Sequence, residues 1–448
     1  MKIAFIKPNI GRKGHSLYVD EGRMEPLTLG VLAALTPEDI EVVLYDDRME
    51  QINYDDKIDL AVITVETYTA RRAYEIAAEY RKRGVKVSMG GMHPMLIPEE
   101  VSQHADVVCI GDAEYFWDEL IQDLRENKLK PLYKGGAAKP QRAITRRDIF
   151  KGKGYLPITL LQFSRGCPNG CKFCASSKYF NKQHTCREIK DVIKEIESQN
   201  RKFLFFVDDN IVANPEKAKE LCRALIPMKV KWVSQASLNM VNDLELVELM
   251  AKSGNLGNVM GFESITPQNM KEIGKEPNTL FDTYKEPVKI LRDYGFQTWA
   301  AFTLGYDNDT EESLWRTYEF ALESKFAFAA YNILMPYPNT PLYDDLKAQN
   351  RLLYDGKWWL HPEYRFNHAS YIPKNMTPDR FTEVSFDIRT KYNSFKSIAY
   401  RAFDFKTHMR NPFRLAVYLQ YNPIFRKEVF KKQDMQFGLG EVIDEKEQ

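Results

Sequence analysis

Three cysteines stand close enough together in the sequence to bind a metal centre. Cys167, Cys171 and Cys174 fall within eight positions, which suits a metal site in a reducing compartment better than a disulfide framework. Three thiolates on one loop can bind three irons of a 4Fe–4S cubane and leave the fourth iron open to a ligand that is not protein. The alternatives are a zinc site or three unrelated thiols. Structural zinc usually takes four protein ligands in paired spacing, whereas Cys186 and Cys222 are isolated.

The cysteine segment resembles that of the radical S-adenosylmethionine (SAM) superfamily. The hallmark of that superfamily is C-x3-C-x2-C with an aromatic residue before the last cysteine, and this chain has Phe173 there. The resemblance implies that SAM chelates the open iron, and that an electron from the cluster cleaves SAM to methionine and a 5′-deoxyadenosyl radical. It also implies an external electron donor of the flavodoxin or ferredoxin type. The protein then contributes positioning and the exclusion of water.

Polar residues at the ends of predicted strands are the candidates for the rest of the SAM site. By the same resemblance, Asp208 and Asp209 face the methionine amino group, for which a carboxylate is a suitable partner. Gln235 and Ser237 end the third barrel strand and are candidates for bonds to the ribose or the carboxylate. Glu263 ends the fourth strand and can accept from ribose hydroxyls. The competing interpretation is helix capping, which is common in βα loops, although glutamate is a poor capping residue.

The N-terminal part of the chain resembles the cobalamin-binding domain of the cobalamin-dependent members of the superfamily. Such domains place a small polar residue after the third strand and paired glycines after the fourth, where the nucleotide tail lies against the backbone. Together with the cysteine segment and the units after it, the resemblance spans residues 1–345. It implies that cobalamin is bound by the residues at three strand ends: Thr64, Glu66, Thr67, Gly90, Gly91, Gly111 and Glu114.

The cobalt-ligating motif of many cobalamin domains is absent. Where D-x-H-x-x-G usually follows the first strand, this chain reads Lys7-Pro-Asn-Ile-Gly-Arg-Lys-Gly-His15, and His15 lies too far along without the preceding acid. Many members of the radical subgroup also lack this histidine. We therefore expect cobalamin without a protein histidine below the cobalt, and the alternative is a domain that binds nothing. His93 is interpreted as a hydrogen-bonding loop residue and not as a metal ligand.

Two α/β series must position these residues. In residues 1–135, short apolar strands alternate with amphipathic helices such as 70–83, which predicts a doubly wound, Rossmann-like parallel sheet. A linker rich in Gly, Lys, Arg and Pro at 136–156 leads to six βα units in 157–345. These predict a partial (β/α)6 barrel with its active site at the C-terminal strand ends. Residues 346–448 are predicted to form a mainly helical segment that covers the barrel.

The C-terminal segment combines basic and aromatic residues. Thr377-Pro378 is typical of a helix start, and the spacing of apolar residues from Phe381 to Ala402 predicts one apolar helix face. Between Arg389 and Lys432, eleven Lys and Arg stand against two acids, with ten aromatics interleaved. The first interpretation is a solvated basic face over an aromatic core that covers the barrel. Contact with an anionic membrane is the second, and single-stranded nucleic acid is the third.

The composition sets outer limits on function. The chain has 448 residues, 44% of them hydrophobic, and a formal net charge of only +1, so no field of the whole molecule steers a charged partner. The first ten residues do not form a secretory signal, and no segment approaches the ~20 apolar residues that span a bilayer. We expect a cytoplasmic protein, with peripheral contact at the inner membrane face as an extension.

These features together predict a cobalamin-dependent radical SAM C-methyltransferase that acts on an unactivated carbon. Its partner is a small-molecule substrate, for which a lipid or another amphiphile is the expected class. The first alternative is a radical cyclase or oxidoreductase of the same architecture. The second is a redox-sensing iron–sulfur binding protein.

Overall fold

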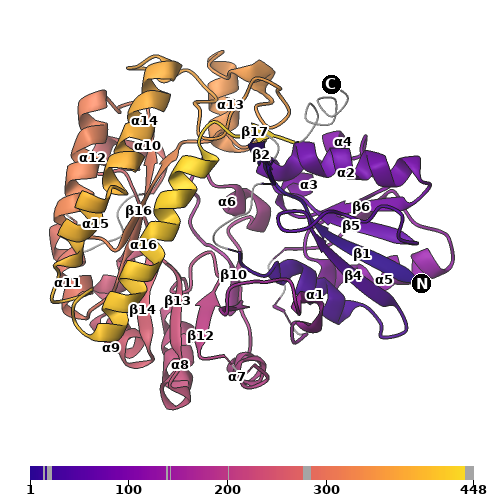
Figure 1. Cartoon of the computed structure of the whole chain (residues 1–448), viewed down its shortest axis with the longest axis horizontal. Helices are drawn as coiled ribbons and strands as arrows, with labels where there is room; N and C mark the ends of the chain where they lie inside the picture. Colours follow the sequence, from indigo (N-terminus) through magenta and orange to yellow (C-terminus); the bar gives the residue numbers. More distant parts are fainter. Residues whose placement is uncertain are drawn as a thin grey trace.

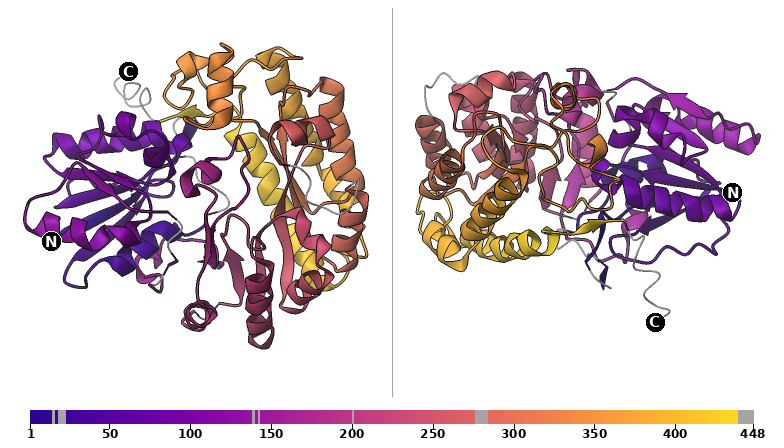
Figure 2. Two further views of the ribbon diagram at one scale, coloured as in Figure 1. Left: turned by 180° about the vertical axis from the view of Figure 1, so that it is seen from behind. Right: turned by 90° about the horizontal axis from the view of Figure 1, so that it is seen from above.

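Two α/β domains lie side by side, and a helical segment covers the outer side of the second (Figure 1). Both views of Figure 2 show the N-terminal domain beside the barrel, with the yellow C-terminal helix running along the barrel. His15 and the last ten residues lie outside the described part of the chain. This computed structural model describes residues 1–13, 16–17, 23–137, 140–141, 143–199, 201–275 and 284–438.

The first domain is the expected doubly wound sheet. Six parallel strands have the order β4-β1-β5-β6-β7-β8. The strands are β1 (Lys2–Lys7), β4 (Glu41–Asp46), β5 (Leu60–Thr64), β6 (Lys86–Gly90), β7 (Val107–Ile110) and β8 (Leu132–Lys134). Helices cover both faces: α1 (Leu27–Leu35), α2 (Ala70–Lys82), α3 (Met92–Leu96), α4 (Pro98–Val101) and α5 (Trp117–Arg125). The strand order reverses between β1 and β5, which is where such sheets bind ligands.

The second domain is the expected partial barrel. Six parallel strands follow one another in sequence order: β9 (Thr159–Leu161), β12 (Phe203–Phe206), β13 (Lys231–Ala236), β14 (Asn255–Glu263), β15 (Trp299–Leu304) and β16 (Phe328–Ile333). The helices between and after them are α6 (Ala175–Phe180), α7 (Ile189–Glu197), α8 (Pro215–Leu225), α9 (Leu244–Lys252), α10 (Pro267–Glu272), α11 (Lys285–Asp293), α12 (Glu311–Glu323) and α13 (Pro341–Ala348). The sheet stays open between its first and last strands, so a side of the barrel can face the other domain.

The apolar stretch from Phe381 to Ala402 forms two helices and not one. Helix α14 (Pro378–Tyr392) begins as expected, because the hydroxyl of Thr377 accepts from the backbone N–H of its third residue. Helix α15 (Phe395–Ala402) has its own cap in Ser394. The chain therefore turns after Tyr392, which is fully buried, and leaves Phe395 67% exposed. The expectation of one continuous apolar face is wrong beyond Tyr392, because the first helix ends there and Ser394 caps the start of a second one.

The C-terminal helix ties the two domains together. Helix α16 (Pro412–Lys432) runs back toward the first domain, where β17 (Gln436–Phe437) pairs antiparallel with β2 (Gly11–Lys13), which in turn pairs with β3 (Ser16–Leu17). No helix in the described ranges is both long and apolar enough to cross a bilayer. The first sheet ends at Lys134 and the second begins at Thr159. The domain limits at 135, 156 and 345 stay predictions.

Candidate functional site

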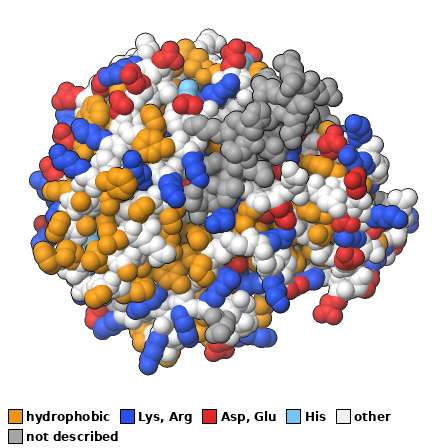
Figure 3. All heavy atoms as spheres, viewed as in Figure 1, with side chains coloured by type: hydrophobic (Ala, Val, Ile, Leu, Met, Phe, Trp, Pro, Cys, Tyr) orange, Lys and Arg blue, Asp and Glu red, His pale blue; other side chains and the backbone are white. Residues whose placement is uncertain are grey.

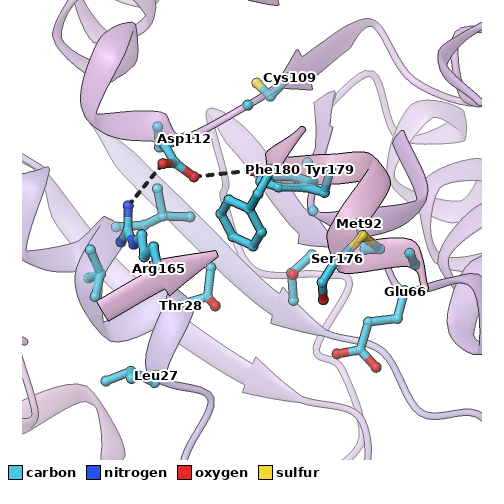
Figure 4. A pocket seen from close by; sticks show the side chains of 18 of the residues that line it. Leu27, Thr28, Glu66, Met92, Cys109, Asp112, Arg165, Ser176, Tyr179 and Phe180 are labelled. Atoms are coloured by element: carbon cyan, nitrogen blue, oxygen red, sulfur yellow. Dashed lines mark hydrogen bonds and ion pairs between the residues drawn. The ribbon is translucent and has the colours of Figure 1, made fainter. Parts of the chain in front are cut away.

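A cavity of about 690 Å³ lies between the domains, at the carboxyl ends of both sets of strands (Figure 4). Phe173 and Cys174 of the cysteine segment line it from the barrel side. The residues predicted to bind cobalamin line it from the other side: Thr64, Glu66, Thr67, Gly90, Gly91, Gly111 and Glu114. The two regions that the sequence assigns to different cofactors therefore open into one space.

Gly91 keeps the backbone at the cavity wall free of side chain. Its φ is +111°, in the region that favours glycine. A Cβ at this position would lie 2.9 Å from the carbonyl oxygen of Val65, closer than such atoms approach. At Gly90, a Cβ would meet Cys109 at ordinary van der Waals distances, 3.4 Å from its Cβ and 3.8 Å from its carbonyl oxygen. The paired glycines thus leave a bare strip of backbone along the cavity, which fits a ligand that lies flat against it.

Thr67 is held from behind the cavity wall by a buried hydrogen-bond network. Its hydroxyl oxygen lies 3.3 Å from Nδ1 of His93, whose Nε2 lies 3.1 Å from the hydroxyl oxygen of Tyr74. The Tyr74 hydroxyl and the indole N–H of Trp359 both donate to Oε1 of Glu100, at 3.1 and 2.9 Å. Burial opposes the charge on Glu100, but hydrogen bonds from His93 and Trp359 lower its pKa to about 2.

This network fixes one proton of His93. Because Tyr74 donates to the Glu100 carboxylate, the Nε2–H of His93 is the donor toward the Tyr74 oxygen and toward Oε1 of Glu100, at 3.1 and 3.3 Å. Nδ1 of His93 is hydrogen-bonded to the hydroxyl of Thr67, which lines the cavity. The interpretation of His93 as a hydrogen-bonding residue is confirmed, although His93 lies in the short helix α3 and not in a loop.

Arg165 joins the two sides of the cavity (Figure 4). It lies in β10 (Ser164–Gly166), just before the first cysteine, and its guanidinium nitrogens lie 3.4 Å from Asp112 and 2.8 Å from Glu114. The Tyr179 hydroxyl donates to the other oxygen of Asp112 at 3.2 Å. Burial disfavours the charge on Arg165, but Glu114 outweighs it and raises the pKa of Arg165. Glu114, a predicted cobalamin residue, is thereby tied to the strand that carries the cysteine segment.

Lys7 occupies the strand end where other cobalamin domains carry a histidine motif. Its ammonium lies 2.7 Å from Oε1 of Glu66, and the charge of Lys7 lowers the pKa of Glu66. The Glu66 side chain is still 57% accessible, because it projects into the cavity. The end of β1 therefore contributes a cation that balances a carboxylate on the cavity wall.

The cysteine segment folds on a short hairpin that sequence analysis did not predict. Strand β10 pairs antiparallel with β11 (His184–Cys186), and Gly166 makes the bend with a φ of +86°. A Cβ on Gly166 would lie 2.1 Å from the carbonyl oxygen of Gln183, so the hairpin requires glycine there. Cys171 is buried, and burial raises its thiol pKa to about 11. Cys167 and Cys174 are half-buried.

The three thiols of the cysteine segment lie on one loop. Within the described residues, no three His, Cys, Asp or Glu side chains converge closely enough to hold one metal ion. A 4Fe–4S cluster does not require such convergence, because each thiolate binds a different iron.

The position of Glu263 is set by an unusual backbone conformation and by two side-chain partners. It has a φ of +58° at a register shift in β14, an unusual conformation for a residue with a side chain. The Thr303 hydroxyl donates to one carboxylate oxygen at 3.0 Å, and the ammonium of Lys275 lies 2.6 Å from the other. Burial opposes the charge on Lys275, but Glu263 raises its pKa. The positive charge of Lys275 in turn acts on Cys171, where it opposes the effect of burial.

Asp208 and Asp209 accept hydrogen bonds from the strand that leads into the cysteine segment. Asp208 is fully buried and accepts from the backbone N–H of Phe163 at 3.1 Å and the hydroxyl of Ser164 at 2.5 Å. Burial raises the pKa of Asp208 to about 7. Asp209 accepts from the backbone N–H of Gly166 at 3.1 Å. Both carboxylates hold the hairpin in place, and direct contact with SAM stays a prediction for each.

Gln235 and Ser237 are half-buried at the end of β13, next to the end of β12. The backbone N–H of Ser237 donates to Oδ1 of Asn210 at 3.0 Å. Their roles toward SAM, like those of Phe173 and Glu263, stay predictions. Arg165 lies two residues before Cys167 and was not among the predicted site residues, although its position beside the motif could have indicated it. Lys275 was not predicted either, because only the folded chain shows its contact with Glu263.

The model of the radical SAM superfamily matches residues 161–321, which contain the cysteine segment and the barrel strands after it. Residues 161–321 therefore form a radical SAM domain. The chain is 29% identical over 383 residues to the bacteriochlorophyllide d C-12(1)-methyltransferase of Chlorobaculum tepidum, with 82% of each chain covered. It is 27% identical over 331 residues to the anaerobic magnesium-protoporphyrin IX monomethyl ester cyclase of Cereibacter sphaeroides, covering 66% of this chain and 53% of the cyclase.

The fold is also found in a solved structure. The cobalamin-dependent SAM radical enzyme OxsB, solved with aqua-cobalamin and SAM bound, superposes with a TM-score of 0.64 at 14% identity. The superposition covers 96% of this chain and 71% of OxsB. The two-domain fold of this radical SAM enzyme is therefore shared almost from end to end.

Proposed function

We propose that the chain is a cobalamin-dependent radical SAM methyltransferase that methylates an unactivated carbon of a small molecule. The observation that carries the proposal is the shared cavity, onto which seven predicted cobalamin residues and the cysteine segment both open. Methyl donor and radical source would then face one substrate. The similarity to a methyltransferase over 82% of both chains supports the same reaction class.

The residues present fit these cofactors. Cys167, Cys171 and Cys174 would hold the 4Fe–4S cluster, and the bare backbone at Gly90 and Gly91 would take a flat ligand. The bound cofactors would supply the radical and the methyl group. Cobalamin without a histidine lower ligand stays part of this proposal.

The chain's own contribution is to bind, orient and shield. Arg165 and Glu114 hold the cavity walls together, and Thr67 is a polar residue of the wall that can hydrogen-bond the ligand. The aromatic rings of Phe173 and Phe180 line the wall and exclude water from it. The residues predicted to bind SAM keep that role in the proposal: Phe173, Asp208, Asp209, Gln235, Ser237 and Glu263.

We further propose an external electron donor of the flavodoxin or ferredoxin type and a location in the cytoplasm. The methyltransferase relative is named for a bacteriochlorophyllide, and the cyclase relative is named for a magnesium-protoporphyrin ester. These names support a substrate with a large apolar framework, in keeping with the expected amphiphile. The cavity, whose accessible lining is more apolar than polar, suits such a framework.

A cyclase or oxidoreductase is the second candidate, because one relative of this chain is a cyclase. Anaerobically reconstituted protein distinguishes the two when it is incubated with SAM labelled in its methyl group. A methyltransferase moves label onto the corrinoid and then onto an added acceptor, and it releases 5′-deoxyadenosine. A cyclase releases 5′-deoxyadenosine without labelled product. A redox sensor does neither.

The cluster assignment is tested by Cys171→Ala, with Cys186→Ala as its matched control. Both cysteines lie in the same hairpin region, but only Cys171 belongs to the motif. We expect iron and sulfide to fall to background in Cys171→Ala and to stay at the native level in Cys186→Ala. Stoichiometric zinc with little iron in the native protein would refute the assignment.

A further inference from the structure

Six of the ten aromatic residues between Arg389 and Lys432 lie on the surface. Only Tyr392 and Tyr418 are fully buried. Figure 3 shows hydrophobic side chains gathered on this side of the molecule, over α15 and the lower part of α16. The exposed rings are Phe395 (67% accessible), Tyr400 (49%), Phe403 (62%), Phe405 (74%), Phe413 (47%) and Phe430 (41%). The interpretation that these aromatics pack inward as a lid is therefore wrong for most of them.

The exposed charges within this stretch have one sign, and one of them, Lys406, is ion-paired with Asp293 of α11. Both acids of the stretch are neutralised by ion pairs: Asp404 is buried against Arg292, and Glu428 is paired with Lys432. Arg426 stacks between the rings of Phe395 and Phe430, 4.7 and 4.8 Å from their centroids. The exposed charged side chains of the stretch are all basic: Lys391, Lys396, Lys406, Arg410, Lys427 and Lys431. We call this surface the basic aromatic face.

The basic aromatic face lies at the end of the barrel opposite the cavity. The ring of Phe425 in α16 packs on Trp299, at the first residue of β15, with centroids 4.4 Å apart. The guanidinium of Arg414 donates to the carbonyl of Leu256, near the start of β14, at 2.9 Å. Any partner on this face therefore leaves the carboxyl ends of the strands, and the cavity there, uncovered.

We propose that the basic aromatic face binds peripherally to the surface of an anionic lipid bilayer. Exposed phenylalanines that project from two helices and the turn between them, among cations, are suited to the headgroup region, where rings enter the apolar boundary and cations meet lipid phosphates. A second copy of this chain is a poor occupant, since it would set one largely basic surface against another. The inference does not depend on the cofactors or on the reaction.

The test is sedimentation of the full chain with vesicles. Native protein sediments with vesicles of phosphatidylcholine and phosphatidylglycerol in equal parts, remains in solution with pure phosphatidylcholine, and is released as salt is raised to about 0.5 M. The triple substitution Phe403→Ser, Phe405→Ser and Phe413→Ser lowers the partition coefficient about tenfold or more. These rings are at least 47% accessible, so their loss leaves the fold intact by circular dichroism.

The matched control replaces three exposed hydrophobic residues elsewhere, Leu132, Leu244 and Ile372, by serine. It should sediment like the native protein. The proposal is overturned if the native chain stays in the supernatant, if both triple variants sediment equally, or if the native chain sediments equally with neutral vesicles. It is also overturned if the chain is a dimer that the Phe403, Phe405 and Phe413 substitutions convert to a monomer. Retention by single-stranded oligonucleotide in place of vesicles would assign the face to nucleic acid instead.

Discussion

At the scale of single residues, Gly90 and Gly91 are neighbours with different physical duties. Gly91 has a backbone conformation with φ +111° and ψ −163°, which is essentially confined to glycine. Gly90 ends β6 with room for a methyl group. The conformation of Gly91 concerns folding, whereas the missing side chain of Gly90 concerns the space left for a ligand.

We expect Gly91→Ala to lower the free energy of unfolding by about 1–3 kcal/mol, because the new Cβ clashes with the Val65 carbonyl and the backbone is strained. Gly90→Ala should change it by less than about 1 kcal/mol. Urea denaturation of the two variants measures the difference. Equal midpoints would contradict the assignment of backbone strain to Gly91.

Thr67→Val keeps the shape of the side chain and removes the hydroxyl that is hydrogen-bonded to Nδ1 of His93. The buried Nδ1 is then unsatisfied, so we expect a loss of about 1–3 kcal/mol in stability and weaker corrinoid uptake by absorbance titration. Thr67→Ser retains the hydroxyl and should restore both. A valine variant as stable as the serine variant would show that the network does not reach Thr67.

At the scale of elements, His408 attaches the turn between α15 and α16 to the barrel. Its ring is 1% exposed; Nε2 donates to the carbonyl of Lys325 at 2.9 Å, and Nδ1 accepts from the Gln297 amide at 3.3 Å. The neutral imidazole is thus fully satisfied. Burial lowers the pKa of His408 to about 4.

This depressed pKa predicts acid sensitivity. Because the folded pKa is below the ordinary value of 6.5, the unfolded chain takes up the proton first as pH falls, and stability is lost between pH 6.5 and about 4. The full loss from this group is about 3 kcal/mol. Urea midpoints at pH 7 and pH 5 should differ less in His408→Gln than in native protein. His361→Gln, at a partly exposed histidine, should leave the native difference unchanged.

At the scale of the whole molecule, the cavity exists only because two domains are held against each other. Arg165 pairs with Asp112 and Glu114 across that boundary, and the three side chains are at most 12% exposed. Strand β17 returns from the barrel to pair with β2 of the first domain. Trp359 reaches from the C-terminal segment to Glu100. Of these three ties, that of Arg165 lines the shared cavity.

Arg165→Gln should lower stability by about 3 kcal/mol, because it leaves buried carboxylates without their cation. Arg146→Gln breaks an exposed pair with Asp148 and should cost at most about 1 kcal/mol. Chemical denaturation compares the two, and corrinoid titration should show weaker binding only in Arg165→Gln. Similar behaviour of the two variants would mean that the domains are held by other contacts.

The sequence by itself determined the two parallel sheets and the strand ends that carry the candidate residues. Alternating apolar strands and amphipathic helices follow from local periodicity, and the cysteine spacing is local too. Periodicity could not place the break after Tyr392, because a single serine cap decided it. It could not reveal the hairpin of β10 and β11, whose strands are only three residues each.

Only the tertiary structure decided which of these residues share a site. Glu114 and Arg165 are far apart in sequence, and their pairing depends on how two separately folded sheets dock. The direction in which the C-terminal aromatics point was also undecided, because a ring at a helical position is buried or exposed according to what packs beside it. Local sequence fixes the conformation of each element, whereas contacts between distant elements depend on packing that no local pattern encodes.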